Sequence, residues 1–242
     1  MKKMFFIDAG TTWSKVVVLN DNNEFYNEYK NYFVKSDGMK SYYIMPSKLI
    51  KQVDITFDCA TTGHMAKLKN INHNNHYNEI IALANGVSKK IENEKEAIIL
   101  DLGSRDSKWI RFIDGKFSDL DWNASCGSST GATIEMLLKF YDLKTDDIKY
   151  QDEKYNVTCG IFAFEKIMDD ISNGLTPNVA IARLIHGIAY NSFCFANKPN
   201  KIFLSGGFCN FDAYLTSLKK YCEVETLGRF LLCEGLINMQ NL

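Results

Sequence analysis

The segments FFIDAGTTWSKVVVLN (residues 5–20) and IILDLGSRDSKWIRFI (residues 98–113) share one pattern. In each, an apolar run ends in Asp-x-Gly, and polar residues, a Ser-Lys pair and a second apolar run follow. Two apolar runs joined by a short turn with glycine are typical of a β-hairpin. Two such hairpins with matching Ser-Lys pairs indicate an internal repeat with a period of about 90 residues. We therefore expect two similar α/β domains, residues 1–94 and 95–242, with the last helix able to pack back on the first domain.

The apolar patterning of the rest of the chain predicts further strands and helices. The run at 24–34 alternates apolar and polar residues and is predicted to be a strand, whereas 77–91 has the spacing of a helix with one apolar face. The complete prediction has strands at 4–8, 15–20, 24–34, 55–61, 96–103, 108–113, 116–122 and 201–205, helices at 77–91, 130–141, 160–173 and 177–196, and a final helix, strand and helix. His186, in the apolar helix at 177–196, is expected to be packed and hydrogen-bonded.

The composition excludes several classes of protein. The 28 basic and 29 acidic residues give a formal net charge of -1, so the chain has no basic field for nucleic acid. The apolar run at the N-terminus is interrupted by Asp8 and is too short for a signal peptide, and no other segment reaches the length of a membrane span. We expect a cytoplasmic protein that binds neither nucleic acid nor membrane.

The chain has seven cysteines, an odd number without a Cys-x-x-Cys pair, so a disulfide framework is not expected. Five of them are expected to be core residues. Cys126 differs, because the segment WNASCGSSTG (122–131) surrounds it with the small and polar residues of a tight turn. The sulfur of Cys126 is thus predicted to be open to a ligand or partner.

Three turns carry the residue types that bind phosphate. Glycine lets backbone N–H groups approach closely, hydroxyl groups add donors, and carboxylates hold Mg²⁺. The candidates are Asp8, Gly10, Thr11, Thr12 and Lys15 in the first turn, Asp101, Gly103, Ser104 and Asp106 in the second, and Gly206 and Gly207 in the third. Each turn taken alone is more often an ordinary hairpin or strand end.

The three turns, in this order, are similar to the phosphate-1, phosphate-2 and adenosine motifs of the actin-like ATPase superfamily. That resemblance implies an α/β fold of two ribonuclease-H-like lobes with a nucleotide cleft between them. Within the superfamily, the chain resembles the activators of 2-hydroxyacyl-CoA dehydratases and benzoyl-CoA reductases, of the BadF/BadG type, over residues 4 to about 210. The segments that carry this resemblance are DLGSRDSK (101–108), NASCGSSTG (123–131), VTCGIFAFE (157–165), LIHGIAYN (184–191) and SGGF (205–208).

The resemblance implies a homodimer that holds one [4Fe-4S] cluster through Cys126 and Cys159 of both subunits. It also adds Thr130 and Gly131 to the nucleotide-binding residues, and makes Asp8 and Asp101 the catalytic carboxylates that organise Mg²⁺ and the attacking water. The activity implied is that of an ATPase coupled to electron transfer. It would accept an electron from a ferredoxin or flavodoxin and activate a partner iron–sulfur dehydratase or reductase.

Two other functions remain open at this point. A small-molecule kinase with an actin-like fold, similar to N-acetylglucosamine or pantothenate kinases, would use Asp106 or Asp58 as a general base, and its cysteines would be incidental. A nucleotide-dependent assembly module without enzymatic activity is the other alternative, although it gives the paired cysteines no role.

Overall fold

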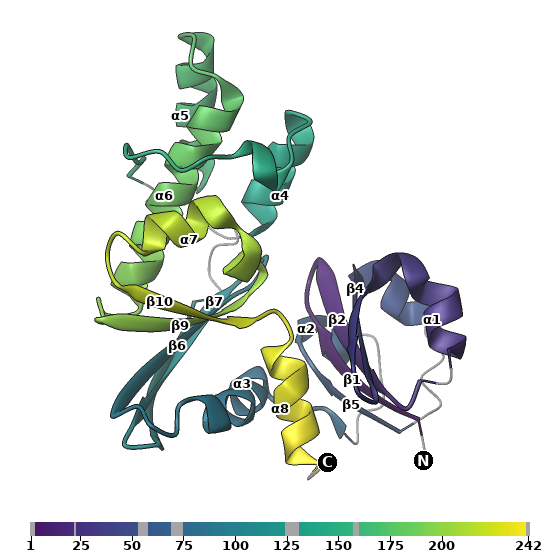
Figure 1. Cartoon of the computed structure of the whole chain (residues 1–242). Helices are drawn as coiled ribbons and strands as arrows, with labels where there is room; N and C mark the ends of the chain where they lie inside the picture. Colours follow the sequence, from purple (N-terminus) through teal and green to yellow (C-terminus); the bar gives the residue numbers. More distant parts are fainter. Residues whose placement is uncertain are drawn as a thin grey trace. The chain divides into compact units, whose positions relative to one another are not determined.

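The computed structural model describes residues 3–21, 23–52, 58–68, 75–123, 131–156 and 160–240. The chain forms two compact units (Figure 1). Unit 1 contains Met1–Glu92 and Arg229–Leu242, and unit 2 contains Asn93–Gly228. The chain therefore returns to unit 1 after it has completed unit 2. The domain limits expected from the sequence, 1–94 and 95–242, stay a prediction.

Unit 1 has a five-stranded sheet in the order β3-β4-β2-β1-β5. Its strands are β1 (Met4–Ala9), β2 (Trp13–Leu19), β3 (Phe33–Asp37), β4 (Lys40–Pro46) and β5 (Asp58–Thr62). Neighbouring strands are antiparallel except for β5, which runs parallel to β1. In the β1–β2 hairpin, Asp8 lies directly opposite Lys15.

Unit 2 has a five-stranded sheet in the order β10-β9-β6-β7-β8. Its strands are β6 (Glu96–Leu102), β7 (Ser107–Ile113), β8 (Lys116–Asn123), β9 (Lys201–Gly206) and β10 (Glu223–Gly228). The β6–β7 and β7–β8 pairs are antiparallel, whereas β9 is parallel to both β6 and β10. Asp101 on β6 lies opposite Lys108 on β7.

The two sheets share one four-stranded arrangement, which confirms the internal repeat predicted from the sequence. The order β4-β2-β1-β5 in unit 1 corresponds to β8-β7-β6-β9 in unit 2, with the same strand directions. The units differ at the sheet edges, since β3 lies beside β4 in unit 1 and β10 lies beside β9 in unit 2. The cross-strand Asp–Lys pair on the first hairpin also occurs in both units.

Each unit covers its sheet with its own helices. Unit 1 contains α1 (Glu24–Tyr29), α2 (His64–Leu68), α3 (Glu79–Val87) and α8 (Leu231–Met239), and unit 2 contains α4 (Gly131–Phe140), α5 (Gly160–Ser172), α6 (Pro177–Phe195) and α7 (Asp212–Leu218). On α6, His186 is buried, as predicted; its Nδ1 donates to the carbonyl oxygen of Gln151 (2.9 Å) and its Nε2 bonds the Tyr221 hydroxyl (2.8 Å). Among the described residues, no helix combines the length and apolar character needed to span a bilayer.

The strand predicted at 24–34 is wrong. Residues 24–29 form helix α1, and strand β3 begins only at Phe33. The carboxylate of Asp21 accepts the backbone N–H groups of Phe25 (3.3 Å) and Tyr26 (3.2 Å), which satisfies two of the free donors at the helix start. Phe25 and Tyr29, one helical turn apart, are both buried. The helical spacing of these two aromatic residues therefore decides the local structure, and the alternation of apolar and polar residues at 24–34 does not.

Helices α3 and α8 pack closely through glycine (Figure 1). A Cβ added at Gly235 would overlap the carbonyl oxygen of Ala82, and one added at Gly86 would overlap the carbonyl oxygen of Leu231. The overlapped atoms belong to the backbone and cannot rotate away. The two glycines therefore set the separation of the helices that cover this face of unit 1.

We expect Gly235→Ala to lower the free energy of unfolding by about 3 kcal/mol, because the cost of overpacking exceeds the gain in helix propensity of about 1 kcal/mol. Urea denaturation followed by circular dichroism measures this change. Gly207→Ala is the control, since a Cβ there would lie 3.9 Å from its nearest neighbour, the carbonyl oxygen of Leu102. Equal stability of the two variants would contradict the packing argument.

Candidate functional site

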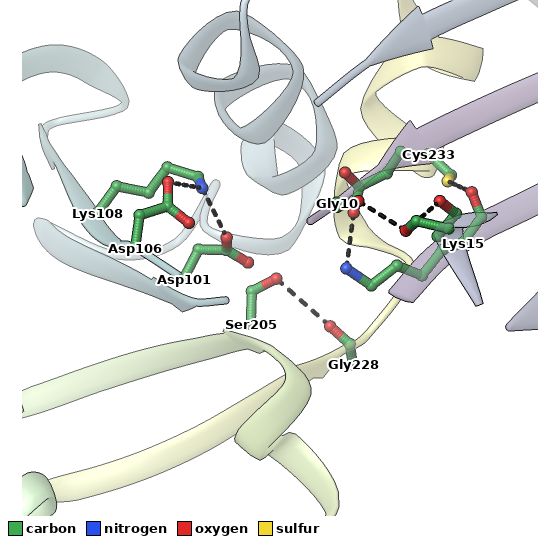
Figure 2. A network of polar contacts seen from close by, with 11 residues as sticks. Gly10, Lys15, Asp101, Asp106, Lys108, Ser205, Gly228 and Cys233 are labelled. Atoms are coloured by element: carbon green, nitrogen blue, oxygen red, sulfur yellow. Dashed lines mark hydrogen bonds and ion pairs between the residues drawn. The ribbon is translucent and has the colours of Figure 1, made fainter. Parts of the chain in front are cut away.

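In unit 1, the β1–β2 turn is built around a largely buried ion pair. Lys15 Nζ donates to Asp8 Oδ2 at 2.8 Å, and the side chains are only 13% and 8% exposed (Figure 2). Strand alternation places both side chains on the same face of the sheet, and the hairpin register brings them opposite each other. The two residues thus satisfy each other's charge next to the Gly10-Thr11-Thr12 turn.

Hydrogen bonds from β4 and its continuation fix the backbone of this turn. Ser47 Oγ donates to the carbonyl oxygen of Gly10 (2.6 Å), and the backbone N–H of Ser47 donates to the carbonyl oxygen of Thr12 (2.9 Å). Ser14 Oγ lies 2.8 Å from Ser47 Oγ. Glycine is needed at position 10, because an added Cβ would lie 2.6 Å from the carbonyl oxygen of Trp13. The sequence analysis did not identify Ser47, which lies outside the repeated pattern.

Cys233 on α8 also supports the unit-1 turn. Its Sγ donates to the carbonyl oxygen of Lys15 at 3.4 Å (Figure 2). Burial raises the pKa of the Cys233 thiol well above its ordinary value, so the sulfur stays uncharged. Cys233 therefore acts as a small packed residue with a weak donor, as expected for a core cysteine.

In unit 2, the corresponding ion pair has a third member. Lys108, which is 2% exposed, lies with its Nζ 3.2 Å from Asp101 Oδ2 and 3.3 Å from Asp106 Oδ2 (Figure 2). The indole Nε1 of Trp122, at the end of β8, donates to the same Asp106 oxygen at 2.6 Å. Asp106 is therefore held by two donors from different strands. Sequence analysis identified neither Lys108 nor Trp122 as part of the site.

The unit-2 turn is also hydrogen-bonded to the start of α4. The backbone N–H of Gly131 donates to the carbonyl oxygen of Gly103 (3.3 Å), and that of Ala132 donates to the carbonyl oxygen of Ser104 (2.9 Å). A Cβ at Gly103 would lie 2.8 Å from Asp106 Oδ1, so glycine leaves the space that this carboxylate uses. The structure thus brings Gly131 together with Gly103 and Ser104; the nucleotide-binding role of these residues stays a prediction.

The third predicted turn lies at the same edge of the unit-2 sheet. Because β9 is parallel to β6, Ser205 lies beside Asp101 and Gly206 lies beside Leu102. Gly206 has a φ of 91°, a conformation that favours glycine, and a Cβ there would overlap the carbonyl oxygen of Leu102. Ser205 Oγ donates to the carbonyl oxygen of Gly228 at 3.4 Å (Figure 2). The predicted nucleotide-binding residues of unit 2 that the structure describes therefore gather at the carboxyl ends of parallel strands β6 and β9.

The predicted cluster ligands Cys126 and Cys159, and the predicted nucleotide residue Thr130, lie outside the described residues. The neighbouring described elements are β8, which ends at Asn123, α4, which begins at Gly131, and α5, which begins at Gly160. Within the described part of the chain, no group of three His, Cys, Asp or Glu residues could hold a metal ion. The cluster assignment therefore stays a prediction.

Five cysteines in the described residues are outside any disulfide, and they lie where core residues were expected. Cys59, Cys209 and Cys233 are buried, and Cys194 and Cys222 are half-buried. Burial raises the pKa of the Cys222 thiol to about 11, so very little of it is thiolate at neutral pH. Packing accounts for these thiols without a role in ligand binding.

Two α/β units with this strand order, each with an Asp-containing turn on its first hairpin, form an actin-like fold. The fold of the activator of 2-hydroxyisocaproyl-CoA dehydratase from Clostridium difficile, solved with bound ADPNP, matches with a TM-score of 0.75 at 15% identity, covering 99% of this chain and 95% of that one. Component A of the Acidaminococcus fermentans (R)-2-hydroxyglutaryl-CoA dehydratase matches with a TM-score of 0.74 at 18% identity, covering 99% and 97%.

Curated relatives agree with the resemblance seen in the motifs. The activator of lactoyl-CoA dehydratase from Anaerotignum propionicum is 25% identical over 201 residues, which is 76% of each chain. The (R)-2-hydroxyglutaryl-CoA dehydratase activating ATPase of A. fermentans is 23% identical over 203 residues, 79% of this chain and 76% of the relative. No family model matches the chain. The resemblance to dehydratase activators predicted from the sequence is confirmed.

We expect Lys108→Met to lower the free energy of unfolding by about 3–5 kcal/mol, because it leaves the carboxylates of Asp101 and Asp106 without their buried counter-charge. Chemical denaturation at neutral pH measures the change. Lys116→Met, at an exposed lysine of the same sheet, is the control and is expected to change stability by less than about 0.5 kcal/mol. Similar losses in both variants would mean that the ion-pair network does not stabilise unit 2.

Proposed function

We propose that this chain is an ATPase that activates a 2-hydroxyacyl-CoA dehydratase. The observation that carries the proposal is the similarity to two dehydratase activators over 76% and 79% of the chain, one of which is named as an activating ATPase. The fold supports it, because a dehydratase activator with bound ADPNP has the same arrangement of elements. The proposal assigns the β1–β2 and β6–β7 turns to phosphate and Mg²⁺ binding.

The residues of these turns suit a magnesium nucleotide. Asp8 and Asp101 are the proposed catalytic carboxylates, and both are nearly buried, at 6% and 5% exposure. Gly10 and Gly103 provide backbone without side chains, and the neighbouring Thr and Ser hydroxyls add donors for phosphate oxygens. Mg²⁺ prefers carboxylate and phosphate oxygens, and the ion-pair network of unit 2 holds two carboxylates to one lysine ammonium group. We therefore assign Mg²⁺ binding mainly to Asp101 and Asp106.

We further propose that Cys126 and Cys159 of two subunits hold one [4Fe-4S] cluster, which would make the protein a homodimer. A cluster of this type needs four thiolates, and two chains related by a two-fold axis would supply them. Helix α5 begins at Gly160, directly after Cys159, and helix α4 begins five residues after Cys126. The free N–H groups at helix starts favour an anionic group nearby. The bound cluster would supply one-electron chemistry.

The proposed cellular role follows from that chemistry. The activator would take an electron from a ferredoxin or flavodoxin and pass it to an iron–sulfur dehydratase or reductase, with ATP hydrolysis coupled to the transfer. We propose that this takes place in the cytoplasm.

The alternative of a small-molecule kinase finds less support in the geometry. Such an enzyme needs a carboxylate that can take a proton from a substrate hydroxyl. Asp106, nominated for that role from the sequence, is engaged by Lys108 and by the indole N–H of Trp122. These two donors compete with a substrate hydroxyl for the carboxylate of Asp106.

Asp101→Asn is expected to lower the ATPase rate about 100-fold or more, because the amide can neither hold Mg²⁺ nor orient water as a carboxylate does. The measurement is phosphate release from Mg·ATP by the folded variant, checked by circular dichroism. Asp114→Asn, in the exposed turn between β7 and β8, is the control. An Asp101→Asn protein with the wild-type ATPase rate would refute the catalytic assignment.

Protein purified without oxygen, or reconstituted with iron and sulfide, is expected to contain about two iron atoms per chain and to run as a dimer. Cys126→Ser and Cys159→Ser are expected to lose most of the iron, whereas Cys194→Ala, at a half-buried cysteine of α6, retains it. Iron content, visible absorbance and gel filtration measure these outcomes. Wild-type protein that stays iron-free and monomeric would exclude the shared cluster while leaving the ATPase assignment intact.

A further inference from the structure

We infer that Trp122 is a positioning residue that links nucleotide binding at the β6–β7 turn to the residues on both sides of segment 124–130. This inference rests on the proposed nucleotide binding and adds a route by which the occupied turn influences the part of unit 2 that contains Cys126. Two sets of contacts make up this route. The first is the Trp122–Asp106 hydrogen bond before segment 124–130, and the second is the pair of hydrogen bonds between the turn and the start of α4 after that segment.

The first side of the route is the indole contact. Trp122 Nε1 donates to Asp106 Oδ2 at 2.6 Å, a short distance that is typical of a donor bonded to a carboxylate. The ammonium group of Lys108 lies 5.3 Å from the centre of the indole ring, within the range of a cation–π contact. All eight residues of β8 are exposed, and the Trp122 side chain remains 37% exposed. Polar contacts to the turn, more than burial, therefore orient this side chain.

The second side of the route is the start of α4. The N–H groups of Gly131 and Ala132 donate to the carbonyl oxygens of Gly103 and Ser104, in the same turn that contains Asp106. These two hydrogen bonds and the Trp122 contact bracket segment 124–130, because Trp122 precedes it by two positions and Gly131 follows it directly. A change in the turn therefore acts on both flanks of the segment.

Asp106 is the group through which bound nucleotide acts on Trp122. One of its oxygens, Oδ2, is shared by Lys108 and Trp122, and the other lies over Gly103 in the turn. Mg²⁺ bound near Asp106 competes with Lys108 and Trp122 for the carboxylate oxygens of Asp106. A bound phosphate group repels the same carboxylate. Either effect changes the orientation or charge density of the Asp106 carboxylate. The hydrogen bond from the Trp122 indole N–H to that carboxylate changes with it. Phenylalanine at position 122 keeps an aromatic ring but removes this donor.

Hydrogen exchange of the full-length protein, with and without saturating Mg·ADP, tests the inference. In the wild type, Mg·ADP is expected to slow exchange about fivefold at the Gly131 and Ala132 amides and in the unit-1 turn. In Trp122→Phe, Asp106 loses a donor that holds it, so bound nucleotide orders its turn less. The slowing at Gly131 and Ala132, which donate to this turn, is expected to fall below about twofold while the unit-1 turn keeps its response. Tyr26→Phe, which removes a side-chain donor from an aromatic residue of similar exposure (39%) on α1, is the control and is expected to behave like the wild type.

The outcomes separate this inference from the proposed function. Full nucleotide protection at Gly131 and Ala132 in Trp122→Phe would overturn the positioning role and leave nucleotide binding intact. No Mg·ADP effect anywhere in the wild-type protein would overturn nucleotide binding and the inference with it. Faster exchange in Trp122→Phe with and without nucleotide, at an unchanged ratio, would show that the side chain only stabilises the fold and would also overturn the inference.

Discussion

The cross-strand pairing of a buried aspartate with a lysine that is buried in unit 2 and largely buried in unit 1 is the constraint on which both units depend. A carboxylate removed from water costs several kcal/mol unless a counter-charge and hydrogen bonds compensate it. Lys15 meets that requirement for Asp8, and Lys108 meets it for Asp101, each directly across the first hairpin. A slip of one residue would move the lysine to the other face of the sheet, so the pair also specifies the register of the hairpin.

The two units use different supports for the same hairpin. In unit 1, Ser47 and Cys233 bond backbone carbonyl oxygens on either side of the turn, and none of these contacts involves the carboxylate of Asp8. In unit 2, the supports act on the second carboxylate, Asp106, and on the backbone that leads into α4. The unit-1 arrangement favours a rigid turn, whereas the unit-2 arrangement connects the turn to neighbouring elements through groups whose charge balance a ligand can change.

Sequence reasoning identified the repeated hairpins because their information is local: apolar runs, a glycine turn and a matching Ser-Lys pair occur within sixteen positions. It did not identify Ser47, Trp122 or Cys233, since their partners lie far along the chain and no spacing rule connects them. It also misassigned 24–34, where alternation competes with the one-turn spacing of Phe25 and Tyr29 and the deciding contact comes from Asp21. Cys126, Thr130 and Cys159 lie outside the described residues, so their roles stay predictions.

The return of α8 to unit 1 has a consequence for biosynthesis. The face of α3 that contains Ala82 and Gly86 is covered by α8, whose residues are translated only after the whole of unit 2. On the ribosome, unit 2 can therefore complete its sheet while unit 1 still lacks one of its covering helices. Domains generally fold as units during translation, in order from the N-terminus. Unit 1 therefore gains the helix that covers α3 only after unit 2 has been translated.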